Sequence, residues 1–213
     1  MYNTNIKAIL FDMDGVVIDS EKLYSSSEKK LLAKYGVKFD SNDWNYIKGC
    51  TESQFYDLVY KKFNIPISRG QLVKEGRTYL MDVFTEKLNY MNGFSALYSK
   101  INKKYKLALV TSTGSILVNH IDSLLDIKSK FDVIITSEDT QEHKPHKAPY
   151  SKAIEMLGVK KEECIVVEDS LQGIKSGKNA GAIVVALEGS IEKKYLKGAN
   201  YIISHLPHIE NIL

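Results

Sequence analysis

The chain has 213 residues, which is enough for one domain with a sizeable insertion or for two small domains. Its net charge is only +3, and no basic tract is interleaved with aromatic residues, which argues against a general nucleic-acid-binding protein. No uncharged run is long enough to cross a membrane, and the first residues lack the basic-then-apolar order of a signal peptide. Cys50 and Cys164 share no metal-ligand spacing, and we expect both to be buried free thiols. We therefore expect a monomeric cytoplasmic protein that binds neither nucleic acid nor membranes.

Residues 6–15, IKAILFDMDG, form an apolar run that ends in two aspartates and a glycine. Lys7 is the only polar residue before Asp12, so an extended strand here would be apolar on both faces, as is typical of a buried parallel strand. Asp12, Asp14 and Gly15 would then lie at the carboxyl end of the strand, where open α/β sheets bind ligands. Two carboxylates this close favour a divalent cation, and a plain Asp/Gly turn is the alternative.

The segment that follows this strand is predicted to be helical. Apolar residues recur at helical spacing through residues 18–88, and four polar residues are candidate N-caps of successive helices: Ser20, Ser41, Thr51 and Ser68. No convincing strand pattern interrupts this stretch, so it predicts an all-helical block.

From residue 91 onward the pattern alternates between strands and helices. Apolar runs are found at 107–113, 131–139, 163–170 and 182–187, with a possible edge strand at 201–203 and a brief final helix. This alternation predicts an α/β fold with a doubly wound parallel sheet. We predict an α/β core made of residues 1–16 and 91–213, with an inserted α-helical cap at 17–90. Linkers near 15–19 and 88–93 are candidate hinges.

Polar residues stand at the carboxyl ends of three later strands or in the loop that follows. These residues are Thr111, Ser112, Lys144, Glu168 and Asp169. Because parallel strands end at the same edge of a sheet, all of them can share a site with Asp12 and Asp14. Their carboxylates suit Mg²⁺, while the lysine charge and the hydroxyl and backbone N–H of Thr111 suit a phosphoryl group. A carboxylate can attack phosphorus, and a second carboxylate two residues farther along the chain can protonate the leaving oxygen and later activate water.

Four segments in order resemble the motifs of the haloacid dehalogenase (HAD) superfamily: DMDGVVIDSE, LALVTST, the lysine in EHKPHKAPYSKA, and VVEDSLQGIKSGKNAG. The inserted helices resemble the C1 cap of the branch that contains β-phosphoglucomutase and phosphoglycolate phosphatase. The resemblance covers essentially the whole chain, and it implies a Rossmann-like sheet with strand order 5-4-1-2-3.

The resemblance also implies roles for individual residues. Asp12 would be the nucleophile and a Mg²⁺ ligand, and Asp14 would be the general acid/base that gives Mg²⁺ its backbone carbonyl. Thr111 would hold the phosphoryl group, and Lys144 would neutralise charge, with Lys147 as a nearby alternative. Two further residues would complete the metal site, Asp169 as a direct ligand and Glu168 either directly or through water.

The acid/base aspartate at position 14 favours phosphoryl transfer over dehalogenation or phosphonate hydrolysis. β-Phosphoglucomutases that resemble this chain have a histidine where Tyr24 stands and an arginine where Glu52 stands, and both differences argue against a mutase. We therefore predict a Mg²⁺-dependent phosphatase of a small phosphorylated metabolite, such as a sugar or polyol phosphate, acting through an aspartyl-phosphate. A phosphomutase is the alternative, and a non-enzymatic HAD-fold binding protein is a third.

Substrate selection is expected in the cap, because the core recognises only the phosphoryl group. Candidate contacts there are Glu21, Tyr24, Lys48, Thr51 and Glu52, with Ser112 on the core side. Packing or solvated side chains are the alternative for these cap residues. The five histidines have no metal-ligand pairing, and we expect them to be surface or structural residues.

Overall fold

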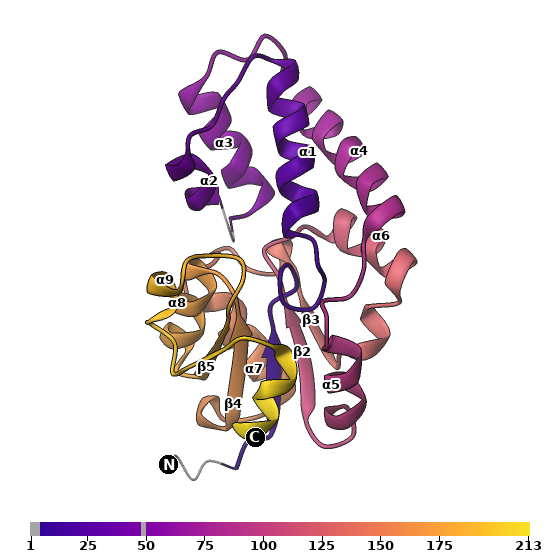
Figure 1. The fold of residues 1–213 in the computed structure, drawn as a ribbon. Helices are drawn as coiled ribbons and strands as arrows, with labels where there is room; N and C mark the ends of the chain where they lie inside the picture. The colour runs from indigo at the N-terminus through magenta and orange to yellow at the C-terminus, as the bar shows by residue number, and fades with distance from the viewer. Residues whose placement is uncertain (1–4, 48–49) are drawn as a thin grey trace.

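The computed structural model describes residues 5–47 and 50–213, and its ribbon consists of an α/β core below a helical cap (Figure 1). The core contains one sheet in the order β3-β2-β1-β4-β5-β6, and every neighbouring pair is parallel. The strands are β1 Ala8–Phe11, β2 Lys106–Val110, β3 Val133–Ile135, β4 Cys164–Glu168, β5 Ile183–Leu187 and β6 Tyr201–Ile203. The expected order 5-4-1-2-3 is confirmed, and the short edge strand adds β6 beyond β5.

Strand β1 is at the centre of the sheet because both of its faces are apolar. All four of its residues are fully buried. Ile9 and Phe11 pack into one hydrophobic cluster, with helices α5 and α6, whereas Ala8 and Leu10 pack into the other, with α7 and α8. Helices therefore cover both faces of the sheet, and the predicted doubly wound α/β class is confirmed.

The helices divide into a cap group and a core group. The cap contains α1 Glu21–Lys34, α2 Ser41–Ile47, α3 Glu52–Lys62 and α4 Arg69–Lys87. The core contains α5 Phe94–Ile101, α6 Ser115–Leu125, α7 Ala148–Leu157, α8 Leu171–Ala180 and α9 Lys193–Leu196. Short 3₁₀ helices are η1 Lys128–Lys130, η2 Ser137–Asp139, η3 Lys161–Glu163 and η4 Leu206–Asn211.

The cap has a hydrophobic core of its own, to which Leu31, Phe55, Val59 and Leu72 contribute. The last turns of α4 leave this cluster, and Phe84 packs into the cluster of the α/β core instead. The two linkers between cap and core lie side by side, since the N–H of Asp19 donates to Asn89 O at 3.0 Å and that of Met91 to Val17 O at 2.8 Å. Cap and core are thus joined by one paired connection, and its action as a hinge stays a prediction.

Two predicted elements differ in detail from the structure. The run at 131–139 contains a strand only at Val133–Ile135, because Thr136 donates from its N–H and its hydroxyl to Asp139 and begins a 3₁₀ turn. The brief C-terminal helix is also a 3₁₀ helix, Leu206–Asn211. Among the described residues, no helix combines the length and the apolar character that crossing a membrane requires.

Candidate active site

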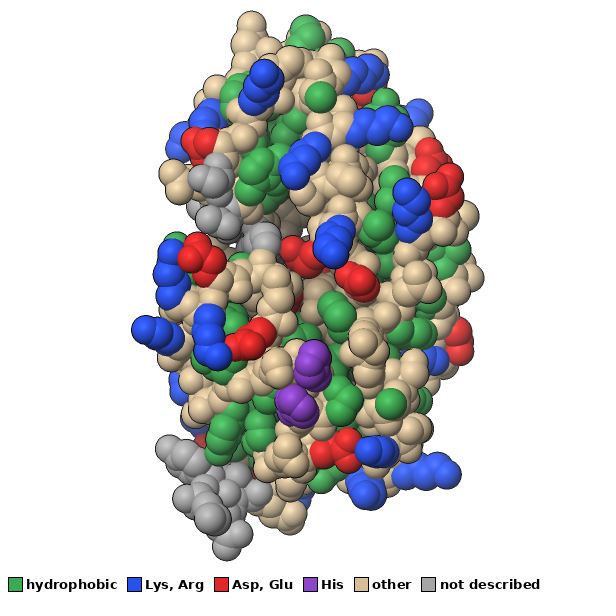
Figure 2. All heavy atoms as spheres, in the orientation of Figure 1, with side chains coloured by type: hydrophobic (Ala, Val, Ile, Leu, Met, Phe, Trp, Pro, Cys, Tyr) green, Lys and Arg blue, Asp and Glu red, His purple; other side chains and the backbone are tan. Residues whose placement is uncertain are grey.

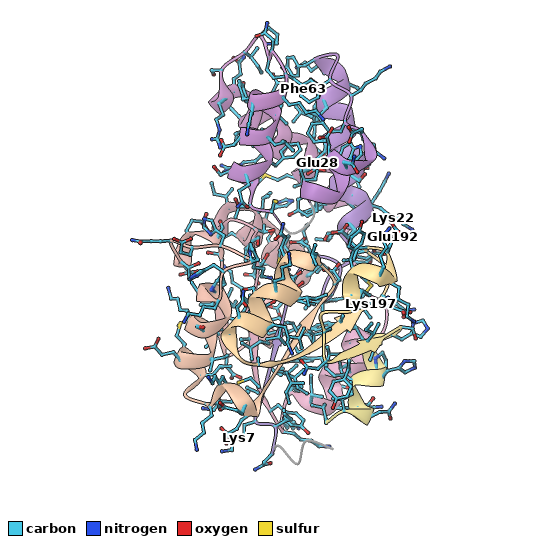
Figure 3. The ribbon with its side chains drawn as sticks, turned by 90° about the vertical axis from the view of Figure 1, so that its left-hand side faces the viewer. Lys7, Lys22, Glu28, Phe63, Glu192 and Lys197 are labelled. Carbon is cyan, nitrogen blue, oxygen red and sulfur yellow. The ribbon has the colours of Figure 1, made fainter. Side chains whose placement is uncertain are left out.

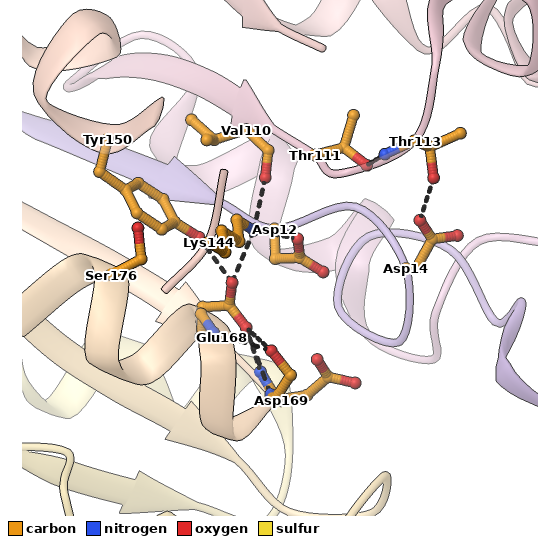
Figure 4. Close-up of polar contacts among 12 residues, drawn as sticks. Asp12, Asp14, Val110, Thr111, Thr113, Lys144, Tyr150, Glu168, Asp169 and Ser176 are labelled. Carbon is orange, nitrogen blue, oxygen red and sulfur yellow. Dashed lines mark hydrogen bonds and ion pairs between the residues drawn. The ribbon is translucent and has the colours of Figure 1, made fainter. Parts of the chain in front are cut away.

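The register of the sheet brings the predicted site residues to one edge. Phe11 is opposite Leu109 on one side and Val167 on the other, so β1, β2 and β4 end at the same level. Asp12 directly follows β1, and its N–H donates to Val167 O at 2.9 Å. Figure 4 shows the result: Asp12, Lys144, Glu168 and Asp169 converge beside the end of the sheet.

Lys144 is buried beneath the edge of the sheet, with 3% of its surface exposed. Its Nζ donates to Asp12 Oδ1 at 2.5 Å, to Glu168 Oε1 at 2.7 Å and to Val110 O at 2.9 Å. Burial alone would lower the pKa of Lys144, but the charges of Asp12 and Glu168 outweigh it and raise the pKa, so the side chain stays cationic. Lys147, the alternative, is exposed and lies at the start of α7.

Glu168 is completely buried, and both of its oxygens accept hydrogen bonds. Oε1 accepts from Lys144 and from the hydroxyl of Tyr150 at 2.8 Å, while Oε2 accepts from Ser170 Oγ at 3.0 Å and from the N–H groups of Asp169 and Ser170. A Cβ at Gly173 would come within 1.7 Å of Oε1, so only glycine fits at the start of α8. The carboxylate of Glu168 is therefore held in one position.

Asp12, Glu168 and Asp169 each have a carboxylate oxygen within 4.8 Å of the other two. Asp169 is fixed between the hydroxyl of Ser190 and Gly15, where φ is +77° and a Cβ would lie 2.0 Å from Asp169 Oδ2. Burial raises the pKa of Asp169, and the charges of Asp12 and Glu168 raise it further. Hard oxygen donors with excess negative charge are the ligand set that Mg²⁺ takes, so these residues fit that ion.

Asp14 is held by two hydroxyl side chains, one of which also contacts a tyrosine. Ser20 Oγ donates to Oδ1 at 2.7 Å, Thr113 Oγ1 donates to Oδ2 at 2.8 Å, and the hydroxyl of Tyr24 lies 3.2 Å from Thr113 Oγ1. Burial raises the pKa of Asp14, and the hydrogen bonds from Ser20 and Thr113 oppose that shift. A carboxyl group with a raised pKa is suited to donate a proton.

Sequence reasoning missed the roles of Ser20 and Thr113. Ser20 is the residue before α1, as expected of an N-cap, but its side chain makes no capping bond and binds Asp14 instead. Thr113 stands two residues after Thr111, and this repeat of hydroxyl residues after β2 was the signal that could have identified it.

Thr111 directly follows β2, just as Asp12 directly follows the neighbouring strand β1, and the side chain of Thr111 is buried. Its hydroxyl oxygen accepts a hydrogen bond from the N–H of Thr113 at 3.0 Å, so its O–H hydrogen can point to a ligand. The expectation that its backbone N–H would contact an anion is wrong, because that group donates to Ile135 O at 2.9 Å.

A cavity of about 180 Å³ lies between the cap and Asp12, Asp14 and Asp169 of the core. Its lining includes the predicted contacts Glu21, Tyr24, Thr51, Glu52 and Ser112. The sixth, Lys48, lies outside the described residues.

Two of the predicted cap contacts are already engaged by the protein. Thr51 forms a capping box with Gln54 at the start of α3. Glu52 forms a two-point ion pair with Arg77 of α4, with Nε at 2.8 Å and Nη2 at 2.5 Å. Glu28 and Arg77 also line the cavity, and sequence reasoning missed both.

Among the described residues, the cluster of Asp12, Glu168 and Asp169 includes no cysteine and no histidine. Cys164 is a buried free thiol as expected, but Cys50 is only half-buried and lines the cavity. His120 lies between the cap and the core, with Nε2 at 3.2 Å from both Met81 O and Thr85 Oγ1. Within the described residues, no histidine joins a cluster that could hold a metal ion.

Residues 9–187 match the model of the haloacid dehalogenase-like hydrolase family. The chain belongs to this family. A phosphorylated carbohydrates phosphatase of Thermotoga maritima is 30% identical to the chain, over 83% of the chain and 82% of that protein. A 6-phosphogluconate phosphatase of Escherichia coli is 26% identical, over 84% of the chain and 80% of that protein. The family and these relatives place the chain among the hydrolases.

A crystal structure of a β-phosphoglucomutase from Clostridium difficile has the same fold, with a TM-score of 0.80 and 21% identity over 97% of this chain and 96% of that one. The fold of this chain is therefore shared with that mutase, and the fold alone does not distinguish a phosphatase from a mutase.

Proposed function

We propose that the chain is a phosphatase that transfers the phosphoryl group of a small phosphorylated metabolite to Asp12 and then to water. The observation that carries this proposal is the pairing of two differently held aspartates. Asp12 is bonded to the buried ammonium of Lys144, whereas Asp14 is held by the neutral hydroxyl groups of Ser20 and Thr113. One carboxylate is therefore suited to attack, and the other to carry a proton.

In this mechanism Asp12 attacks phosphorus with Oδ2, because Lys144 occupies Oδ1. Asp14 gives its proton to the oxygen of the leaving alcohol as the P–O bond breaks. The aspartyl-phosphate at Asp12 is then attacked by water, which loses its proton to Asp14. Lys144 and the hydroxyl of Thr111 compensate the charge on the phosphoryl oxygens.

We assign the Mg²⁺ ligands to Asp12, Asp169 and the backbone carbonyl of Asp14. Glu168 supports them through Lys144 and the Asp169–Ser170 turn, since direct ligation would cost it one of its hydrogen bonds. When bound, Mg²⁺ would supply positive charge for the phosphoryl oxygens.

The cap bears on the choice between phosphatase and mutase. A mutase must hold a second phosphate away from the reacting one, and Arg77 is a cation in the cavity that the sequence reasoning had not counted. Glu52 already occupies Arg77 at two points, which supports the phosphatase. Incubation with a hexose 1-phosphate separates the two, because a phosphatase releases free sugar and a mutase yields the isomeric sugar phosphate.

Phosphate release by the purified chain with Mg²⁺ tests the proposal, with p-nitrophenyl phosphate and a panel of sugar, polyol and nucleotide phosphates as substrates. We expect Asp12→Asn to abolish release without loss of the fold. Full activity of that variant would rule out the mechanism, and binding without release by the parent chain would favour the non-enzymatic alternative.

A further inference from the structure

The cap wall of the cavity carries a carboxylate that has no partner among the described residues. Glu28 lines the cavity from α1, one turn after Tyr24. Because a helix rises 1.5 Å per residue, Glu28 is about 6 Å farther from the core along α1 than Tyr24, which reaches Thr113. Figure 3 labels Glu28 inside the cap, between Phe63 near the tip and Lys22 near the core. No hydrogen bond or ion pair joins Glu28 to any other part of the chain that the structure describes.

The charges around Glu28 are mostly negative. Glu21 lines the cavity from the same helix, Glu52 from α3 and Arg77 from α4, while α2 contributes Trp44 and Ile47. Arg77 is the only cation among the described lining residues, and its charge is matched by Glu52. Burial, together with the charge of Glu21, raises the pKa of Glu28 to about 8. On the outer face of the same junction, Figure 2 shows acidic and basic side chains together, where Asp19 and Glu188 line a surface hollow with Lys22 and Lys29.

We propose that Glu28 determines the specificity of the cap and selects phosphate monoesters whose far end donates hydrogen bonds, as a hydroxyl or an ammonium group does, over esters with a second anionic group there. This inference rests on the proposed phosphatase, because it assumes that the phosphoryl group lies at Asp12.

The arrangement of the cavity explains the selection. With the phosphoryl group at Asp12, the rest of the substrate extends towards α1, between the aromatic side chains of Trp44, Phe55 and Tyr56. Above about pH 8, where Glu28 is ionised, a hydroxyl at the far end can donate to its carboxylate and an ammonium can also pair with its charge. A carboxylate or second phosphate would instead meet Glu28 and Glu21, with the nearby cation already engaged.

Three six-carbon monophosphates that differ only at the far carbon test the inference. Sorbitol 6-phosphate ends in a hydroxymethyl group, 1-amino-1-deoxysorbitol 6-phosphate in an ammonium, and 6-phosphogluconate in a carboxylate. Their Kd values are measured by calorimetry at pH 9, above the pKa of Glu28, with Mg²⁺ in Asp12→Asn protein, so that binding does not depend on turnover. Glu28→Gln and Glu28→Lys are the test variants. Glu86→Gln is the control, because Glu86 is an exposed glutamate of the same cap that does not line the cavity.

With Glu28 intact, we expect the hydroxyl and ammonium esters to bind about tenfold or more tightly than 6-phosphogluconate. Glu28→Gln should bring the hydroxyl ester and 6-phosphogluconate to within about threefold and should weaken the ammonium ester most. Glu28→Lys should reverse the preference, and Glu86→Gln should leave it unchanged. If Glu28→Lys does not fold, Glu28→Gln alone decides, since the amide keeps the shape of Glu28 without adding a charge.

An unchanged preference in Glu28→Gln, or no binding of any of the three esters, would overturn the inference. The proposed function is tested separately by phosphate release from p-nitrophenyl phosphate by the parent chain, which can fail or succeed whatever these Kd values are.

Discussion

Asp169→Asn should make the metal-free protein more stable while it abolishes phosphatase activity. Asp169 is 3% exposed, and its carboxylate has an oxygen within 4.8 Å of oxygens of Asp12 and Glu168. Among the described residues, Lys144 is the only buried ammonium group next to these three carboxylates, and it contacts Asp12 and Glu168. The asparagine side chain would keep the shape of Asp169 and a hydrogen-bond acceptor for Ser190 but would carry no charge.

The magnitude follows from the distance. Two unit charges at 4.8 Å repel by about 3.5 kcal/mol at an effective dielectric constant of about 20, and Lys144 offsets part of this. We therefore expect the variant to gain about 1–3 kcal/mol in free energy of unfolding at pH 7. The variant should also be the more stable protein if Asp169 is protonated at pH 7. Because folding raises the pKa of Asp169 above 3.8, wild type loses stability as pH rises above that value, and asparagine has no proton to lose.

The assay is urea unfolding followed by far-UV circular dichroism, first with EDTA and then with Mg²⁺. Wild type should gain about 2.7 kcal/mol when Mg²⁺ is present at about 100 times its Kd, and Asp169→Asn should gain far less. Asp19→Asn is the control, since Asp19 is exposed and the same chemical change there should stay within about 0.5 kcal/mol. A less stable variant in EDTA, or an equal gain from Mg²⁺ in both proteins, would refute the reasoning.

Three further changes test other parts of the site. Lys144→Met should lower the free energy of unfolding by about 3–5 kcal/mol and abolish phosphate release, because it leaves Asp12 and Glu168 buried without a cation. Urea unfolding measures the change in stability, and a loss below about 1 kcal/mol would contradict this reasoning. Thr113→Val removes a hydrogen-bond donor to Asp14, so kcat for an alkyl phosphate should fall about tenfold or more. The kcat for p-nitrophenyl phosphate should fall much less, because its leaving group needs no proton. Equal losses for the two substrates would argue against the acid role of Asp14. Because the folded chain keeps the proton of Glu28 up to about pH 8 and the unfolded chain releases it near 4.5, stability should fall as pH rises between these values, by an upper limit of about 5 kcal/mol. Glu28→Gln should remove that slope, and urea unfolding at pH 5 and pH 8 would show an unchanged slope if the reasoning is wrong.

The fold could be predicted because its signals are local. An apolar strand on both faces, such as Ala8–Phe11, can only be buried, and parallel strands bring the residues that follow them to one edge. Asp12 and Asp169 were therefore identified from their positions after strands. Lys144 lies in a loop, and its identification depended on the spacing of the family motif rather than on the strand pattern.

The cap contacts were harder to predict because they depend on how helices pack against each other. Glu52 and Arg77 are 25 residues apart, and their ion pair exists only because α3 and α4 lie side by side. Glu28 lies one turn after Tyr24 and two turns after Glu21 on the same face of α1, and this spacing from two predicted contacts was the signal that could have identified it. Ser20 misled for the opposite reason, since its strong local preference for capping was overruled by a partner in the core.

The core and the cap differ in how completely their charges are matched, and we propose that this difference separates catalysis from selection. Every charged group beneath the sheet edge has a fixed partner, and among the described residues no buried polar side-chain atom lacks a hydrogen bond. Such a network has one arrangement and serves any phosphate monoester equally well. The cap wall instead leaves Glu28 to be satisfied by whatever enters the cavity. A substitution there should therefore change which substrate binds while the chemistry at Asp12 and Asp14 continues unchanged.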